Sequence, residues 1–273
     1  MKKRFFAYPY VFWMVLFILL PLFLVIYYAF TSDSSGGIQF SLEHILEAFD
    51  PIYMNVLLRS IWIALICTVI CLVLGYPVAL FLATNGKRAQ KLIIWFMLPM
   101  WINFLLRTYA WMALLDANGL INQFLNMLGF GNVELLYNSG AILMGLVYNF
   151  LPFMILPIYT ALSKIPHSLI EASQDLGANT RRTFLKVIFP LSLPGVISGV
   201  NMVFMPAITT FAISRLLGGS QFMMFGDLVE NQFLTMQDWH LGSSLSFIMM
   251  LLILASMLLF AKYDKGEDGG ALL

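Results

Sequence analysis

The chain has 273 residues, of which 60% are hydrophobic and only 11% are charged. Because a soluble domain carries roughly 25% charged residues, this composition excludes a water-soluble enzyme or a nucleic-acid-binding protein. The formal net charge of +1, from 15 basic and 14 acidic residues, provides no overall field to attract nucleic acid.

Six segments in succession are long and apolar enough to cross a bilayer, which takes about 20 residues of α-helix. Only the third contains a charged residue, Arg107. Unpaired backbone groups are intolerable in hydrocarbon, and the alternation of barrel strands is absent, so all six are predicted to be helices. The expected fold is an all-α, six-span membrane protein with one domain over residues 1–273. The predicted spans cover residues 8–30, 60–84, 92–115, 141–162, 187–214 and 241–261.

Basic residues between the spans predict the orientation, because Lys and Arg are enriched on the cytoplasmic side. Twelve of the fifteen fall on one side of the predicted membrane, which we therefore assign to the cytoplasm. Both termini are then cytoplasmic, in a multi-pass protein of the cell (inner) membrane. The twelve are Lys2, Lys3, Arg4, Lys87, Arg88, Lys91, Lys164, Arg181, Arg182, Lys186, Lys262 and Lys265.

The first apolar segment could also be a cleaved signal peptide, because it follows three basic residues, Lys2, Lys3 and Arg4. It is longer than the roughly 7 to 15 apolar residues of a signal peptide and ends without a small-x-small cleavage site. We expect it to remain as a membrane helix.

The predicted outer surface is acidic. Nine of the fourteen acidic residues lie there, against three basic ones, Arg59, Arg107 and Arg215. Two interpretations of this acidic surface remain open. The residues belong to ordinary solvated loops, or they attract a cationic solute or a basic docking protein.

Motifs for catalysis are missing from the sequence. It contains no G-x-x-x-x-G-K-[ST] for a nucleotide, no H-E-x-x-H, no Cys/His cluster and no G-x-S-x-G. We expect a non-enzymatic chain that holds no cofactor or metal of its own.

The longest cytoplasmic loop, residues 163–186, is predicted to contain a short amphipathic helix. Ser168 and Glu171 have the spacing of a capping box, which predicts a helix start at Leu169. Gly177 then ends the helix, because glycine adopts a positive φ easily. So short a helix is marginal alone and requires packing on both sides. One face of this helix is expected to pack, and it consists of Leu169, Ala172, Ser173 and Leu176. Glu171 and Asp175 lie on another face of the helix.

This loop resembles the EAA loop of ABC-importer permeases, E-A-A-x3-G-x9-I-x-L-P. The match is carried by Glu171, Ala172, Gly177 and Pro190, with Ser173, Val187 and Phe189 as conservative departures. The resemblance implies that the loop is a coupling helix, which fits a groove on a cytoplasmic ATPase. The residues implied in that contact are Glu171, Ala172, Ser173, Asp175 and Gly177.

Further segments resemble the PotB-type permeases of spermidine/putrescine ABC importers. They include L-P-M-W-I-N-F-L-L-R-T-Y at 98–109, N-G-L-I-N at 118–122 and G-L-V-Y-N-F-L-P at 145–152, and the likeness extends over about residues 8–262. It implies a heterodimer with a PotC-like second permease and a PotA-like ATPase pair that binds ATP and Mg. It also implies a PotD-like external binding protein and a linear polyamine as the solute.

Several polar and aromatic residues are candidates for the substrate pathway. Trp111 and Tyr148 can hold ammonium groups by cation–π contact, although interfacial aromatic belts explain them equally. Asn149 precedes two prolines in its span and either lines the pathway or joins two helices. Asp116 and Asp238 are the candidate carboxylates for the amine ends.

The fifth predicted span is the expected mechanical lever. It carries three prolines and a G-x-x-x-G pattern at Gly195 and Gly199, which permits close approach to another helix. At its outer end, an ion pair of Arg215 with Glu230 or Asp227 is predicted to close the mouth, beside Phe211. In PotB-type proteins we expect an acidic side chain near position 215, so Arg215 is a departure.

Two alternatives remain open from the sequence. A permease for another small solute would share the coupling loop but not the polyamine-type segments. A secondary transporter would need acidic residues buried in mid-membrane, and the predicted spans contain none.

Overall fold

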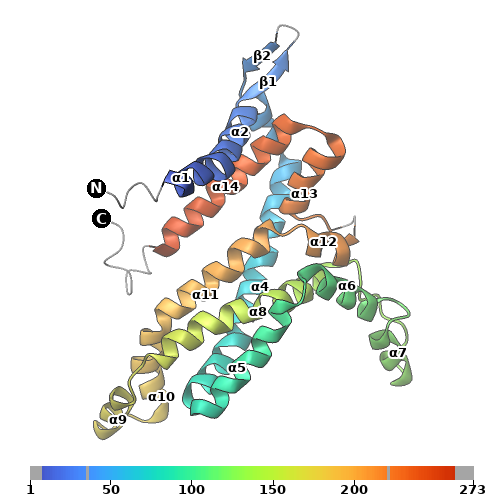
Figure 1. Ribbon diagram of the computed structural model, residues 1–273. Coiled ribbons are helices and arrows are strands. Elements are labelled where there is room, and N and C mark those ends of the chain that lie inside the picture. Colours follow the sequence, from blue (N-terminus) through green and yellow to red (C-terminus); the bar gives the residue numbers. More distant parts are fainter. Residues whose placement is uncertain (1–7, 35–36, 220–221, 262–273) are drawn as a thin grey trace.

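The computed structural model describes residues 8–34, 37–219 and 222–261 (Figure 1). The terminal basic residues Lys2, Lys3, Arg4, Lys262 and Lys265 lie outside the described residues. The described chain is almost entirely helical, which confirms the all-α class. Its elements are α1 (Tyr8–Met14), η2 (Val15–Leu19), α2 (Leu20–Ala29), β1 (Thr31–Ser34), β2 (Gly37–Phe40), α3 (Glu43–Ala48), α4 (Pro51–Thr84), α5 (Gly86–Trp101), α6 (Phe104–Leu115), α7 (Leu120–Met127), α8 (Ser139–Ser163), α9 (His167–Asp175), α10 (Thr180–Thr183), η3 (Phe184–Ile188), α11 (Phe189–Thr209), α12 (Ala212–Leu217), α13 (Phe225–Asn231), η5 (Gln232–Met236) and α14 (Trp239–Ala261).

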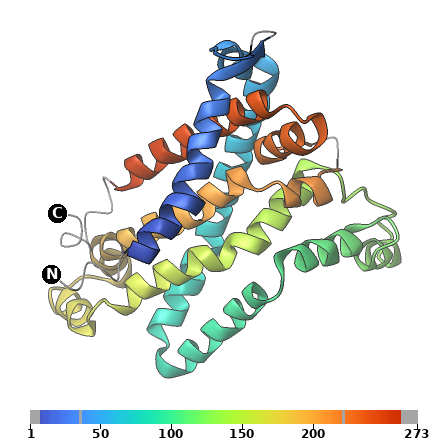
Figure 2. The ribbon, with the colours of Figure 1, turned by 45° about the horizontal axis from the view of Figure 1, so that its top comes forward.

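Helices α4, α8 and α11 pack together at the centre (Figure 2). Their contact faces hold side chains with no exposed surface, among them Cys67 on α4 and Met154 on α8. A Cβ atom on Gly195 would lie 2.6 Å from the Pro157 carbonyl oxygen on α8. This glycine therefore permits the close helix approach that the sequence predicts.

The third predicted span is not one continuous helix. The segments Lys91–Trp101 and Phe104–Met127 are bent by 88° relative to each other. Ile102 is extended, and Asn103 starts a new helix because its Oδ1 accepts a hydrogen bond of 2.9 Å from the Leu105 amide. The prediction of an unbroken helix over 92–115 is wrong, since apolarity alone does not show where a side chain caps a new helix. Among the described residues, five helices could cross a membrane by length and composition, or six if the bent pair is counted.

Two other helix boundaries differ from the prediction. Helix α4 begins at Pro51 rather than near residue 60, because Asp50 caps it by accepting a hydrogen bond from the Ile52 amide. Helix α11 ends at Thr209, where Thr210 becomes extended, so the fifth predicted helix does not continue to residue 214. Residues 212–217 instead form the separate helix α12, which carries Arg215.

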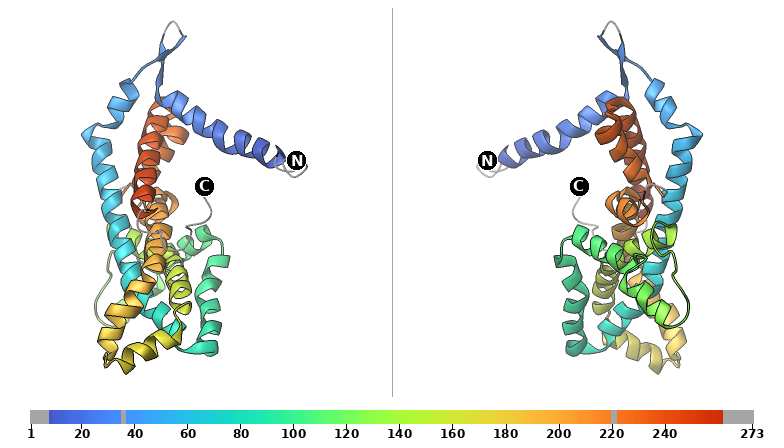
Figure 3. Two further views of the ribbon diagram at one scale, coloured as in Figure 1. Left: turned by 90° about the vertical axis from the view of Figure 1, so that its left-hand side faces the viewer. Right: turned by 90° about the vertical axis from the view of Figure 1, so that its right-hand side faces the viewer.

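The N-terminal arm, made of α1, η2 and α2, projects from the other helices (Figure 3). Its outer end leads into the antiparallel hairpin of β1 and β2, and α2 packs against α14. In Figure 1 the hairpin and the coupling-loop helix α9 lie at opposite ends of the molecule. These opposite ends hold the two candidate functional regions.

Candidate coupling helix and outer gate

Helix α9 begins at His167, two residues earlier than the capping-box pattern predicts. Pro166 is the N-cap residue, and no side chain caps the helix. Ser168 therefore lies inside the first turn, where its hydroxyl cannot take the capping position. The predicted capping box between Ser168 and Glu171 is not formed.

The end of α9 follows the prediction closely. Gly177 has a φ of +80°, which glycine adopts without the steric penalty of a side chain. Its amide donates to the Gln174 carbonyl at 2.8 Å, and the Ala178 amide donates to the Ser173 carbonyl at 3.0 Å. These two bonds form a Schellman motif, which satisfies carbonyls that the helix end leaves free.

The side of α9 that faces its own chain is not the predicted one. Ile170 and Ser173 are partly buried, and Ile170 lines a small cavity with residues of α4 and α8. The Ser173 hydroxyl lies 2.9 Å from the Thr183 hydroxyl, which joins α9 to α10. In contrast, Leu176 is 89% exposed, and Leu169 is also exposed. The predicted packing face is wrong by one residue, because a helix of two and a half turns gives too few apolar positions to define its inward direction.

The implied ATPase-contact residues lie on open surface. Glu171, Ala172, Asp175 and Gly177 are exposed, and no residue of α9 is fully buried. Ser173 is the exception, since its hydroxyl bonds within the chain. Helix α9 thus offers a short apolar strip with flanking carboxylates to another molecule.

A continuous helical connection runs from this surface into the membrane-length helices. Asn179 caps α10 by accepting a hydrogen bond of 2.9 Å from the Arg182 amide. Helix α10 passes through η3 directly into α11. The Ser192 hydroxyl on α11 lies 2.8 Å from the Tyr76 hydroxyl on α4, so a displacement of α9 has a direct path to both helices.

At the outer end, Arg215 on α12 pairs with Glu230 on α13. The Arg215 Nη1 lies 2.9 Å from Oε2 and 3.0 Å from Oε1 of Glu230. The Arg215 side chain is 54% exposed, whereas that of Glu230 is 17% exposed. The ion pair predicted from the sequence is present.

Asp227 lies one turn before Glu230 and is only 6% exposed. Burial raises the pKa of Asp227 from 3.8 to about 6, and the Glu230 charge adds to the rise. The hydrogen bond with Ser214 and the charge of Arg215 act in the opposite direction. Phe211, the other residue of the predicted gate, is half-buried and is the N-cap of α12.

Helix α13 is anchored to α4 by contacts that the sequence analysis missed. The Phe225 amide donates to the Ser60 hydroxyl at 2.8 Å, and the Arg59 guanidinium donates to the Met223 carbonyl. A Cβ on Gly226 would lie 2.3 Å from the Thr209 carbonyl oxygen, so α13 sits directly against the end of α11. The two hydrogen bonds to α4 join residues more than 160 positions apart in the chain, and no local motif marks them.

The pathway candidates on α6 and α8 meet in the structure. The rings of Trp111 and Tyr148 pack edge to face with centroids 5.3 Å apart. Asn149 is 2% exposed, and its amide nitrogen donates to the Gly145 carbonyl at 2.8 Å. Its Oδ1 has no hydrogen-bond partner among the described residues, nor do Nε and Nη1 of the buried Arg107.

Asp116 and Asp238 do not share a site. Asp116 borders a cavity of about 530 Å³ at the end of α6, which Glu134 also lines. Asp238 borders another cavity, of about 590 Å³, beside Asp33 and Trp239. Both carboxylates also make local bonds, Asp116 with the Asn118 amide and Asp238 with the Leu241 amide at the start of α14.

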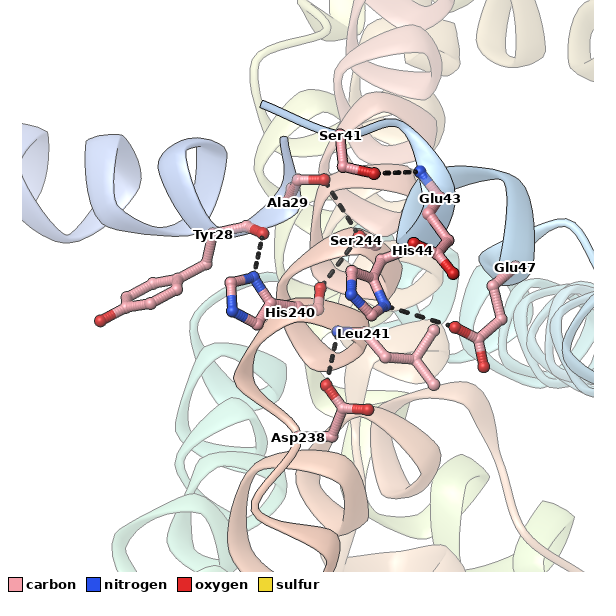
Figure 4. A network of polar contacts seen from close by, with 10 residues as sticks. All are labelled: Tyr28, Ala29, Ser41, Glu43, His44, Glu47, Asp238, His240, Leu241 and Ser244. Atoms are coloured by element: carbon pink, nitrogen blue, oxygen red, sulfur yellow. Dashed lines mark hydrogen bonds and ion pairs between the residues drawn. The ribbon is translucent and has the colours of Figure 1, made fainter. Parts of the chain in front are cut away.

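A network of polar contacts near Asp238 includes residues of α2, α3 and α14 (Figure 4). The rings of His44 and His240 stack with centroids 5.2 Å apart, and His44 lies 3.3 Å from the Glu47 carboxylate. The His240 Nδ1 lies 3.0 Å from the Tyr28 carbonyl oxygen. The two histidines are isolated in the sequence, so only the tertiary structure brings them together.

The membrane-length helices of the described chain lie between the exposed helix α9 and the Arg215–Glu230 ion pair. A family model described as "Binding-protein-dependent transport system inner membrane component" matches residues 72–266. The chain belongs to this family. It is therefore a multi-pass permease subunit of the ABC-importer class.

Relatives and solved structures agree with that family. The chain is 38% identical over 253 residues to the spermidine/putrescine transport system permease protein PotB of Escherichia coli K12, covering 90% of this chain and 92% of that protein. It is 36% identical over 261 residues to PotB of Haemophilus influenzae, covering 93% and 91%.

The fold is similar to a chain of a bacterial ABC transporter that imports alginate, with a TM-score of 0.76, 15% identity and coverage of 98% and 97%. It is also similar to a chain of the MetNI methionine transporter, with a TM-score of 0.54, 18% identity and coverage of 80% and 98%. These structural likenesses concern the fold alone.

Proposed function

We propose that this chain is the permease of an ATP-driven importer of linear polyamines such as spermidine and putrescine. Two relatives at 36% and 38% identity bear the name of that transport system. The acidic outer surface fits a cationic solute, because carboxylates concentrate cations at the mouth of a pathway. Both termini are cytoplasmic in this proposal, in keeping with the distribution of basic residues.

The exposed α9 is the observation that carries the coupling part of the proposal. Its apolar residues, above all Leu176, face away from the chain, and a helix of nine residues is marginal without cover. The proposed cover is a groove of a PotA-like ATPase pair, which binds ATP and Mg. This chain performs no catalysis itself and transmits the nucleotide cycle through α10 and α11.

The remaining partners follow the same scheme. A PotC-like second permease completes the translocation pathway, and a PotD-like binding protein delivers the solute to the outer face. Within this chain, the proposed pathway passes Trp111, Tyr148 and Asn149, with Asp116 and Asp238 drawing cations toward it. The Arg215–Glu230 pair, with Phe211 and Asp227 beside it, closes the outer mouth until solute is delivered.

Uptake by the whole complex in proteoliposomes tests the proposal. ATP enclosed on the cytoplasmic side should drive accumulation of labelled spermidine, and excess unlabelled putrescine should compete. A sugar and an inorganic anion serve as competitors of other classes and should have no effect. Accumulation by this chain alone, without the ATPase, would contradict the coupling role, and competition only by another solute class would contradict the polyamine assignment.

A further inference from the structure

The outer gate contains two carboxylates and one guanidinium. Arg215 contacts Glu230 through a single nitrogen, Nη1, and the charges that act on Asp227 within the described residues are those of Arg215 and Glu230. One positive charge therefore faces two acidic groups. With Arg215 in place the group keeps a net negative charge, which attracts a cation from solution.

The two sides of this ion pair differ in how firmly they are held. Glu230 and Asp227 are largely buried on α13, which is tied to α4 through Ser60 and Arg59. The Arg215 side chain is more than half exposed. Because the Arg215 guanidinium is exposed, water can solvate it once it leaves Glu230, while the carboxylates stay in place.

We propose that Arg215 is a tethered competitor of the transported solute: its guanidinium occupies Glu230 at rest, with Asp227 nearby, and a primary ammonium group of the incoming solute displaces it. This inference rests on the proposed polyamine function. An ammonium is a compact cation with three donors, and it suits carboxylates as a guanidinium does. The two cations exclude each other because like charges repel at such short range.

The displacement has a kinetic signature. A site occupied by a tethered group is open to solute for only part of the time, and apparent affinity falls in proportion to that fraction. Removing the competing charge should therefore lower the KM for spermidine about two- to fivefold, since the exposed ion pair is weak. A residue that only closed the gate would give the same fall, and loss of its partner Glu230 would then lower KM too, whereas displacement predicts that loss of Glu230 raises KM.

The test is the concentration dependence of ATP-driven spermidine uptake by the complete complex in proteoliposomes. Arg215→Gln and Arg215→Met both remove the charge and keep a long side chain, so a folding defect in one does not end the test. Arg215→Lys retains a competing cation, and its KM should fall less than that of either neutral variant. Glu230→Gln removes a proposed solute ligand and should raise KM.

The matched control for general electrostatics is Gln123→Glu on α7. Gln123 is exposed and bonds only locally among the described residues, and its substitution changes the outer-surface charge by the same amount as Arg215→Gln. Its KM should remain that of the wild type. An equal fall in KM for Gln123→Glu would show that surface charge, and not displacement at the gate, sets the affinity.

Two failures can be told apart. A wild-type complex that does not take up spermidine overturns the proposed function and this inference with it. The other failure is normal uptake by the wild type together with a KM in Arg215→Gln and Arg215→Met that is not below the wild-type value. That result overturns the displacement but leaves the proposed function standing.

Discussion

Helix α9 at the inner end and helices α12 and α13 at the outer end differ in what surrounds their functional side chains. No residue of α9 is fully buried, and Leu176, which follows its last residue, is 89% exposed. Five residues of α13 are buried, and its two carboxylates meet partners on α12. The difference indicates that the inner end requires another protein, whereas the outer end closes on itself.

The largest loss of uptake is expected from Gly177→Asp, which changes only the end of helix α9. A side chain at a φ of +80° is strained by about 1–2 kcal/mol, and a carboxylate at a helix C-terminus is unfavourable. We expect ATP-driven uptake to fall to background while the chain remains inserted in the membrane. Uptake assays with immunoblots of membranes measure both.

Gly86→Asp is the matched control for this substitution. Gly86 also has a positive φ, +66°, and a Cβ there meets nothing within 4 Å, as at Gly177. It is the first residue of α5 and is not part of the coupling helix. If Gly86→Asp lost as much uptake as Gly177→Asp, backbone strain would explain the loss and the coupling role would not.

A charge exchange at the outer end is expected to have the next largest effect. Arg215→Glu and Glu230→Arg each bring like charges together, which should lower the maximal uptake rate about tenfold. The double exchange restores an opposite pair and should recover most of that rate. A double variant no better than the singles would mean that the pair does not contribute to gating.

The buried Asp227 predicts a smaller, pH-dependent effect at the outer end. Because its pKa is about 6 in the fold against 3.8 ordinarily, the native state holds an extra proton between these values. The contribution of this group to the free energy of unfolding therefore falls as pH rises through that window and is lowest above it. Apparent affinity for spermidine should change about twofold between roughly pH 5 and pH 7 in the wild type.

Asp227→Asn is the variant that isolates this group, because an amide keeps the shape of the protonated acid. Its affinity should be nearly constant over the same pH range, as measured by uptake at a series of spermidine concentrations. A wild-type pH dependence that persists unchanged in Asp227→Asn would assign the titration to another residue.

The smallest effect is expected at Asp238. Asparagine caps a helix about as well as aspartate, so Asp238→Asn should leave the melting temperature of the complex unchanged. Loss of one outer carboxylate should raise the KM for spermidine about twofold. An unchanged KM, in this variant and in Asp116→Asn, would remove both residues from the pathway.

Local chemistry explains which features the sequence predicted well. Bilayer-length apolar segments mark helices wherever they occur, because the lipid interior demands internal hydrogen bonding. The end of α9 at Gly177 follows from the conformational freedom of one residue. The ion pair was predictable because Arg215 is the single basic residue in an outer segment that holds Asp227 and Glu230.

The features that were predicted wrongly depend on neighbours distant in the chain or on capping. The bend before α6 arises where the Asn103 side chain starts a new helix within an apolar segment. The inward face of α9 is set by the bond between Ser173 and Thr183, which apolar periodicity does not include. The anchoring of Phe225 by Ser60 joins residues 165 positions apart.

The sequence by itself determined that this is a helical membrane permease with a short helix that ends at Gly177, because hydrophobic length and glycine conformation are local properties. Only the tertiary structure decided which side of that helix stays open, where the third span bends and how deeply the gate carboxylates are buried. Those outcomes depend on which surfaces exclude one another from solvent, and solvent exclusion is a property of the packed chain as a whole.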